Sequence, residues 1–227
     1  MKLKVSKRAI IVLIIGFCLG LLAIGGMFCY ANFFVDRDFV VAKPAKFVKK
    51  PKNFELKLFM VGDALIHQAV YYDARQSDGS YDFKPMMDLI KPISSSYDLS
   101  YYNQETILGG ASIGYSHYPR FNSPQEVGDA FIDAGFDLVS LATNHTMDKG
   151  EQGVLNSVIY WKSKEGIITS GQWASQEERD MVRIYEKNGI KYAFFSYTTL
   201  TNGLNTPYGK SYLNNVYSDE KAKTDIE

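Results

Sequence analysis

Three short polar clusters in the sequence hold the residue types that bind metal ions and move protons. The first places Asp63 and His67 four residues apart, the second is NQE at 103–105, and the third is TNHTMD at 143–148. Carboxylate and amide oxygens, together with imidazole nitrogen, suit divalent ions such as Mn, Fe(II), Zn or Mg. Two adjacent ions held by such ligands would clamp a phosphoester for in-line displacement.

Each polar cluster comes directly after a stretch that has the pattern of a buried strand. These stretches are residues 55–61, 97–102 and 137–142. In the first stretch the apolar residues alternate and then become continuous, as in a strand that enters a buried sheet. Ligands of open α/β sheets bind beyond the carboxyl ends of the strands. The pattern therefore predicts that the three clusters meet at one edge of a sheet.

Each cluster also has a plainly structural explanation. Gly-Asp is a common turn, Glu105 fits a solvated loop, and His145 fits a turn that Asp148 closes. His67 would equally well pack on the first helical turn after its strand. The placement of all three clusters after consecutive predicted strands favours a functional site over these separate explanations.

Helical patterns lie between the predicted strands, at residues 85–93, 123–135 and 150–164. The second of these helices begins with Ser123 as N-cap and a proline in its first turn, and Gly135 follows its last residue. The apolar side of the third helix is predicted to consist of four residues: Val154, Val158, Ile159 and Trp161.

The remaining patterns complete an alternation of strands and helices. Strands are expected at 167–170 and 192–197, and residues 181–185 are expected to pair with the latter across the turn Asn188-Gly189. Alternation of this kind predicts an α/β fold with a largely parallel or mixed sheet and helices on both faces.

A long apolar run precedes this domain. Residues 9–35 contain no charged side chain, and Lys2, Lys4, Lys7 and Arg8 come before them. Such a run is long enough to span a bilayer, and the positive-inside rule places the N-terminus in the cytoplasm. The alternative is a cleaved signal peptide, which the length of the run and the lack of a small-residue cleavage site disfavour.

The sequence therefore divides into four parts. We expect a basic cytoplasmic tail (1–8), a transmembrane anchor (9–35), a basic linker (36–53) and an extracellular domain (54–227). The linker would rest on anionic headgroups or serve as a solvated spacer. Both cysteines lie in the expected anchor, so the exported domain is stabilised without disulfides.

The formal net charge of zero hides an asymmetry along the chain. Residues 1–52 hold ten Lys and Arg against two Asp, whereas the remainder holds 15 Lys and Arg against 23 Asp and Glu. A domain with this acidic excess is a poor nucleic-acid binder, because little in it would displace counterions from phosphates. The same acidity suits a site that holds cations.

Four motifs, in this order, carry a family resemblance: G-D-x-x-x-H, N-x-E, Y-P-R-F-N-S-P and A-T-N-H-x-x-D-x-G. Together they resemble the CapA family of poly-gamma-glutamate capsule proteins, which is itself similar to calcineurin-like metallophosphoesterases. The resemblance covers residues 56–200 and implies a layered α/β/α domain of metallophosphoesterase type.

The resemblance also implies roles for individual residues. It implies metal ligation by Asp63, Glu105 and Asn144, with His67 and Asn103 as neighbouring contributors to metal and substrate binding. It implies that His145 protonates a leaving oxygen or binds substrate. Asp148 would then orient the His145 ring and support its protonated form.

Two departures from the family pattern stand out. Metallophosphoesterases open with D-x-H, whereas His67 follows Asp63 at four residues. The family also has later motifs of the H-x-G-x-E and G-H-x-x-H kind, and this sequence has three His in all. We therefore expect the chain to be the N-terminal part of a longer protein with a half-built metal site.

Arg120 lies in the third motif, between the second predicted strand and the helix that follows. Its guanidinium would grip a carboxylate or phosphate of an anionic polymer. The alternative is a structural ion pair with Asp133 or Asp137.

Three functions follow from these observations. The first is a membrane-anchored component of capsule or poly-gamma-glutamate synthesis or export at the bacterial cell surface, working with other membrane proteins of a polymer synthesis complex. The second is a metal-dependent cell-surface phosphoesterase. The third is a non-catalytic module that binds an anion or a metal ion.

Overall fold

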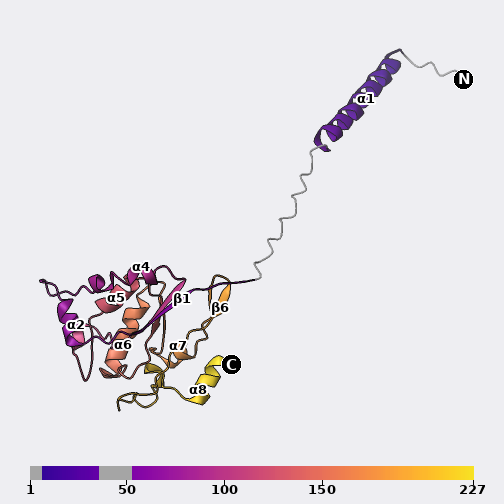
Figure 1. Cartoon of the computed structure of the whole chain (residues 1–227). Helices are drawn as coiled ribbons and strands as arrows, with labels where there is room; N and C mark the ends of the chain where they lie inside the picture. The colour runs from indigo at the N-terminus through magenta and orange to yellow at the C-terminus, as the bar shows by residue number, and fades with distance from the viewer. Residues whose placement is uncertain (1–6, 36–52) are drawn as a thin grey trace. The chain divides into compact units, whose positions relative to one another are not determined.

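The computed structural model describes residues 7–35 and 53–227 (Figure 1). The chain divides into two compact units, Met1–Lys52 and Asn53–Glu227. In the first unit, α1 runs from Lys7 to Val35. Among the residues whose side chains the structure describes, no helix has both the length and the apolarity needed to cross a membrane.

Two predicted segments lie largely outside the described residues. They are the basic tail, of which residues 1–6 are not described, and the basic linker, of which residues 36–52 are not described.

A four-stranded parallel sheet forms the centre of the second unit. Its strands lie in the order β1-β2-β3-β4, so each strand pairs with the strand that precedes it in the chain. The α/β class and the parallel sheet are thus confirmed. The strands are β1 (Leu58–Asp63), β2 (Leu99–Asn103), β3 (Leu138–Ser140) and β4 (Ile168–Ser170).

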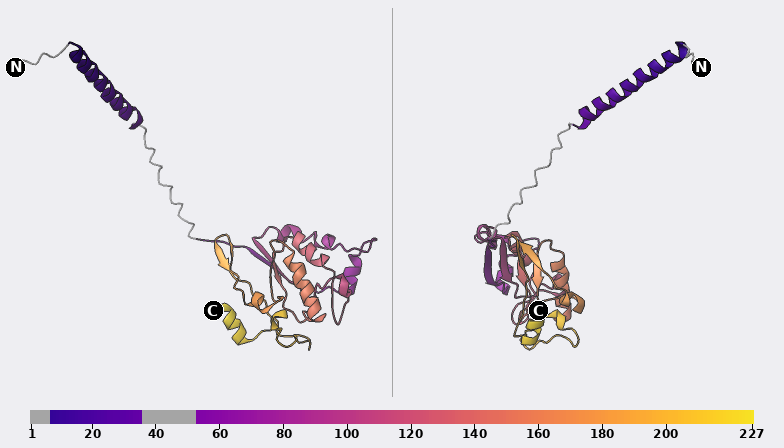
Figure 2. Two further views of the ribbon diagram at one scale, coloured as in Figure 1. Left: turned by 180° about the vertical axis from the view of Figure 1, so that it is seen from behind. Right: turned by 90° about the vertical axis from the view of Figure 1, so that its right-hand side faces the viewer.

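Helices α5 (Glu126–Asp133) and α6 (Gly150–Lys162) cover one face of this sheet (Figure 2). The ring of Tyr102 on β2 stacks on Phe131 of α5 with a centroid distance of 3.9 Å. Right-handed crossovers between strands in sequential order place their helices on the same face. This face holds the main apolar core of the domain.

The opposite face is covered differently over β2 and β3. There the ring of Tyr101 packs against Phe194, at 6.0 Å between centroids, and Ser140 Oγ lies 2.7 Å from Ser196 Oγ. Residues 193–198 are extended chain without a helix. The prediction of helices on both faces is therefore corrected: within the described part of the domain, β2 and β3 have a helix layer on one side and extended chain on the other.

The helix expected at residues 85–93 forms as two short helices, α3 (Lys84–Met87) and α4 (Lys91–Ser94). Each has a proline within its first two residues, Pro85 and Pro92. A proline lacks the N–H that an interior helix position donates, so Pro92 fits the first turn of a separate helix better than the interior of one helix over 85–93.

The expected cap at Ser123 is wrong, because this hydroxyl donates to Thr106 Oγ1 at 2.8 Å. The N-cap of α5 is Gln125 instead. Gly135 does follow the end of α5, with a φ of +88° that favours glycine.

The apolar side of α6 is confirmed for Val154, Val158 and Trp161, which are buried, and wrong for Ile159, which is 69% exposed. At 100° per residue, Ile159 lies about 140° around the helix from Val154, away from the sheet.

The strands expected at 181–185 and 192–197 are wrong in their bounds, because only Tyr185 and Tyr192 of these ranges lie in strands. The hairpin turn predicted at Asn188-Gly189 is present. It joins β5 (Tyr185–Lys187) to β6 (Ile190–Tyr192), and both turn residues have positive φ, 52° and 79°, as in a type I′ turn. The other short elements are α2 (Gln68–Asp73), α7 (Gln176–Asp180), α8 (Asp219–Ile226) and the 3₁₀ turns η1 (Ala111–Ile113) and η2 (Ser211–Leu213).

Candidate functional site

The carboxyl ends of β1 and β2 bring the first two polar clusters into contact. Asp63 is the last residue of β1, and Asn103 is the last residue of β2. Asn103 Nδ2 donates to Asp63 Oδ1 at 2.8 Å, and the Ala64 N–H donates to the Asn103 carbonyl at 2.8 Å. The parallel ladder therefore continues just past the strands and aligns these side chains.

Glu105 lies next to Asp63, and its side chain is 13% exposed. Burial raises the pKa of Glu105, the neighbouring Asp63 carboxyl raises it further, and His145 opposes both effects. Two carboxyl groups placed together in this way repel each other unless a proton or a cation lies between them.

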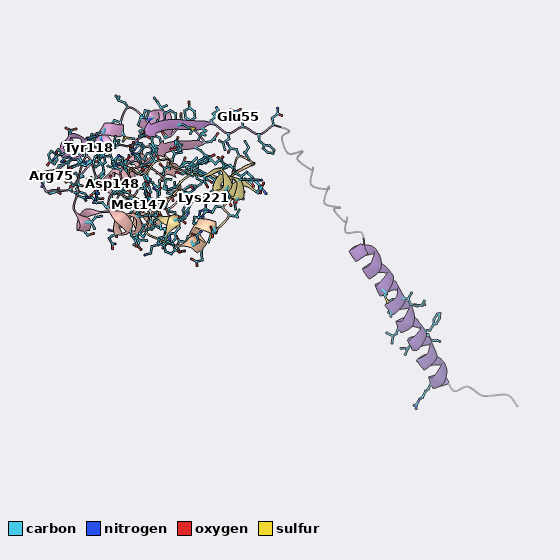
Figure 3. All side chains as sticks on the ribbon, turned by 90° about the horizontal axis from the view of Figure 1, so that it is seen from below. Glu55, Arg75, Tyr118, Met147, Asp148 and Lys221 are labelled. Carbon is cyan, nitrogen blue, oxygen red and sulfur yellow. The ribbon has the colours of Figure 1, made fainter. Side chains whose placement is uncertain are left out.

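The third cluster supplies a hydrogen-bonded pair. His145 Nδ1 lies 2.8 Å from Asp148 Oδ2, and His145 Nε2 lies 3.9 Å from Glu105 Oε1. The Asp148 side chain is 1% exposed, so burial raises its pKa, and hydrogen bonds from the Phe121 N–H and His145 oppose this rise. An ionised Asp148 accepts a hydrogen bond from His145 Nδ1–H, and the other ring nitrogen, Nε2, then faces Glu105. Figure 3 shows Asp148 among the side chains of the domain.

Two threonines hold the turn that carries His145. Thr143 Oγ1 donates to the Glu105 carbonyl at 2.9 Å and accepts from the His145 N–H at 3.1 Å. Thr146 Oγ1 donates to the Leu141 carbonyl at 2.8 Å. Both residues lie inside the third polar cluster, but the sequence alone did not indicate that their hydroxyls position His145.

Asn144 and His67 have contacts outside the carboxyl pair. Asn144 Nδ2 lies 3.5 Å from Asn202 Oδ1, and the exposed His67 precedes α2 and packs edge-to-face on Phe121.

Arg120 is exposed. Its positive charge lowers the pKa of Asp148, and this is the smallest of the effects on that carboxyl. The structural ion pair considered for Arg120 is not formed with Asp133, which pairs with Lys91 at 2.7 Å, or with Asp137, which accepts from the Ser100 N–H at 3.1 Å.

We define the strand-end site as the group Asp63, Asn103, Glu105, His145 and Asp148. Within residues 7–35 and 53–227, no three His, Cys, Asp or Glu side chains are grouped as a metal site would need. The pair of carboxyls is nevertheless accompanied by Asn103 Oδ1, a buried oxygen without a hydrogen-bond partner. Two carboxyls and an amide oxygen form a donor set that fits a hard divalent cation.

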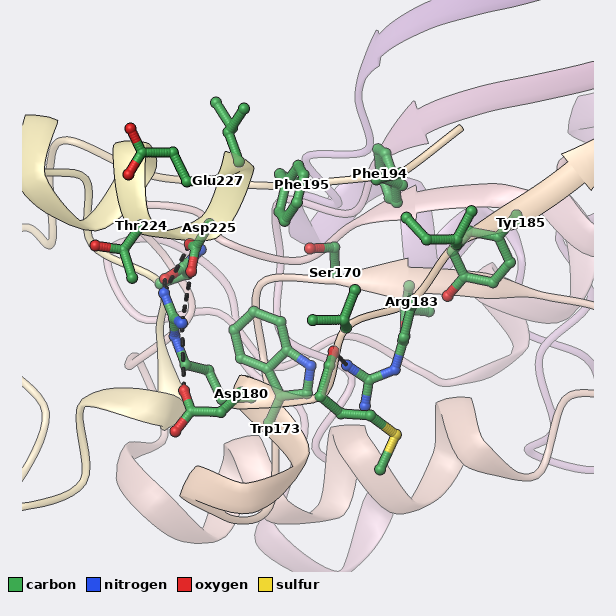
Figure 4. A pocket seen from close by; sticks show the side chains of 18 residues that line it. Ser170, Trp173, Asp180, Arg183, Tyr185, Phe194, Phe195, Thr224, Asp225 and Glu227 are labelled. Atoms are coloured by element: carbon green, nitrogen blue, oxygen red, sulfur yellow. Dashed lines mark hydrogen bonds and ion pairs between the residues drawn. The ribbon is translucent and has the colours of Figure 1, made fainter. Parts of the chain in front are cut away.

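A second region, which the sequence did not predict, forms a cavity of about 540 Å³ (Figure 4). We call it the C-terminal groove. It is lined by α7, residues 181–185, residues 193–195 and the end of α8. Arg179 donates to both carboxylate oxygens of Asp225, at 2.7 and 2.8 Å, and Tyr197 Oη donates to Asp225 Oδ2 at 2.5 Å.

A family model described as bacterial capsule synthesis protein PGA_cap matches residues 57–227. The chain belongs to this family. The matched range contains the whole parallel sheet and the strand-end site, so the CapA resemblance read from the motifs is confirmed. No curated protein matches the chain.

Proposed function

We propose that this PGA_cap protein acts in capsule polymer synthesis or export at the outer surface of the cell membrane. Family membership supports the role in capsule synthesis. The charge-free run 9–35, with Lys and Arg before it, supports an anchor with the N-terminus in the cytoplasm. The partners would be the membrane, other membrane proteins of a polymer synthesis complex, and poly-gamma-glutamate or a similar anionic polymer.

The strand-end site would hold the ion on which this role depends. Asp63 and Glu105 are the proposed ligands, and Asn144 and His67 are proposed as further ligands. The ion would be Mn, Fe, Zn or Mg, and when bound it would act as a Lewis acid toward an oxygen of the polymer. The observation that carries this proposal is the juxtaposition of two carboxyl groups with the His145–Asp148 pair.

The polymer itself would be bound by groups at the rim of the site. Arg120 is exposed and supplies a guanidinium that pairs with carboxylates. Asn103 supplies an amide beside Asp63. These two residues would align an anionic chain beside His145.

A metal-dependent phosphoesterase is the second candidate. It is favoured by His145, whose Nδ1 is held by Asp148 and whose Nε2 points toward Glu105 at 3.9 Å. A histidine fixed in this way would donate a proton to a leaving oxygen. Asp148 would stabilise the protonated ring.

A complementation experiment tests the first candidate. A strain that lacks the gene receives the wild type, Glu105→Gln or the matched control Glu186→Gln, which changes an exposed carboxylate of β5. We expect the wild type and the control to restore surface polymer and Glu105→Gln to fail. Unchanged amount and length of surface polymer in the deletion strain would contradict the proposal.

A panel of phosphomonoesters and phosphodiesters, with and without Mn²⁺, tests the second candidate on the full chain in detergent. Metal-stimulated hydrolysis that is lost in His145→Ala would support it. Ion binding without any turnover would instead support a non-catalytic binding module.

A further inference from the structure

Phe121 lies between the two histidines of the candidate site. Its ring packs edge-to-face on His67, at 5.1 Å between centroids, and edge-to-face on His145, at 4.7 Å. Its backbone N–H donates to Asp148 Oδ2 at 2.7 Å, the same oxygen that lies 2.8 Å from His145 Nδ1. One residue thus contacts both imidazoles and the carboxylate that orients one of them.

Phe121 is itself held firmly in place, with 1% of its surface exposed. The next residue, Asn122, is fully buried and uses its amide to bind the loop that precedes it. Its Oδ1 accepts from the Gly109 N–H at 2.8 Å, and its Nδ2 donates to the carbonyls of Gly110 and Gly114 at 3.0 and 2.8 Å. The backbone position of Phe121 is therefore set by contacts outside the candidate site.

The residues on the other side of Phe121 are exposed. Residues 117–120 form a turn in which the Arg120 N–H donates to the His117 carbonyl at 3.1 Å, and Tyr118 is 68% exposed. The strand-end site thus lies beside a segment that is solvated up to Arg120 and buried from Phe121 onward.

We infer that Phe121 is a positioning residue, which fixes the orientation of His145 and the place of His67 relative to it. Edge-to-face contacts between aromatic rings depend strongly on the ring geometry, so two imidazoles on one phenyl ring constrain each other. The N–H of Phe121 adds a second constraint by holding Asp148 against His145 Nδ1. This inference rests on the proposed function of the strand-end site, since it gives His145 its role.

Histidine ring nitrogens offer a direct test, because the chain has three His, at positions 67, 117 and 145. The full chain, labelled with ¹⁵N in histidine and held in detergent micelles, is compared with Phe121→Leu. This substitution removes the aromatic ring and keeps the N–H. We expect the ring signals of His67 and His145 to shift or broaden, with loss of the single Nδ1–H tautomer of His145, while His117 keeps its signals.

Phe136→Leu is the matched control, because Phe136 is also 1% exposed and packs in the core against Phe59, Tyr102 and Phe131. It creates a similar loss of volume without touching either histidine. We expect all three histidines to keep their wild-type signals. Equal shifts of His145 in the two variants, or unchanged His67 and His145 signals in Phe121→Leu, would overturn the inference.

Phe121→Met provides a second variant if the Leu variant does not fold, since the flexible methionine side chain fills irregular core space. It is expected to shift the same two histidines. The ring signals do not depend on turnover or on polymer. The positioning role of Phe121 can therefore be wrong while the proposed function is right, and the reverse. Shifted His67 and His145 signals in Phe121→Leu, together with no capsule defect in the deletion strain, would refute only the proposed function.

Discussion

The strand-end site and the C-terminal groove handle buried charge in opposite ways. In the strand-end site, burial raises the pKa of both Glu105 and Asp148, and Asp63 raises that of Glu105 further. In the groove, burial alone would lower the pKa of Arg179, but its hydrogen bonds to Asp225 raise it. The strand-end site thus contains carboxyl groups that ionise less readily than usual, whereas the groove contains a paired arginine and aspartate of opposite charge.

Under the proposed function, this difference separates a region that carries out chemistry from one that stabilises the fold. Carboxyls with raised pKa values are typical of functional sites, where a ligand is expected to supply the missing partner. A bidentate pair of Arg and Asp already contains its partners and needs no ligand. We therefore expect substitutions in the strand-end site to change binding and activity, and substitutions in the groove to change the free energy of unfolding.

The largest expected effect is on hydrolysis, under the phosphoesterase proposal. His145→Ala removes the proton donor and should lower the metal-stimulated rate by roughly 10²- to 10⁴-fold, the range typical of a lost general acid. Arg183→Ala, which changes a groove residue, should leave the rate as in the wild type. The rates are measured with the best substrate of the phosphoester panel. Equal losses in both variants would remove the distinction between the two regions.

The next effect concerns the groove. Asp225→Ala removes the bidentate partner of Arg179 at a place where both side chains are 11% exposed, and leaves Arg179 only the 3.4 Å contacts with Asp180 and Asn215. It should lower the free energy of unfolding by about 3 kcal/mol. Urea denaturation of the full chain measures this loss. The matched control is Glu227→Gln, which removes an ion pair with Lys223 in which the two side chains are 69% and 73% exposed, and should leave the midpoint unchanged. A loss below about 1 kcal/mol in Asp225→Ala would show that the pair is not structural.

Added divalent ion should stabilise the wild type through the strand-end site. Mn²⁺ at a concentration 100 times its Kd would raise the free energy of unfolding by about 2.7 kcal/mol. Glu105→Gln should lose most of this gain, while Asp180→Asn, which changes the rim of the groove, should keep it. Thermal unfolding with and without Mn²⁺ provides the measurement. A gain of the same size in Glu105→Gln would place the ion elsewhere.

The smallest effect is a change in pH dependence without divalent ions. The pKa of Glu105 in the folded protein lies above its ordinary value of 4.5, so the folded state holds the proton more tightly than the unfolded chain. The wild type should therefore lose stability relative to Glu105→Gln as the pH rises from 4.5 through the raised pKa. Urea midpoints in EDTA across this range measure the difference. A difference between the two proteins that stays constant across this range, or that shifts in favour of the wild type as the pH rises, would contradict this prediction.

The sheet and the meeting of its polar ends were predictable from local patterns. Buried strands have continuous apolar runs. The residues that follow parallel strands lie at one edge of the sheet, and the conformation of the connecting loops does not change this. This is why Asp63, Glu105 and His145 lie together as expected.

Other features depended on contacts that local patterns do not contain. Serine is a common N-cap residue, but the Ser123 hydroxyl donates its hydrogen bond to the Thr106 hydroxyl. Phe121 reads as an ordinary loop aromatic, and its place between His67 and His145 follows from the fold of the loop around Asn122. The C-terminal groove joins residues 179 and 225, which are far apart in the sequence.

The order of the sheet has a consequence for how the chain folds. Each new strand pairs with a strand that has already been synthesised, so the sheet can grow outward from β1 in the direction of translation. The N-terminal strands leave the ribosome first, and connections between consecutive neighbours keep the loop-closure entropy low. The strand-end site would then be assembled in the same order: Asp63 first, Glu105 against it, and His145 last.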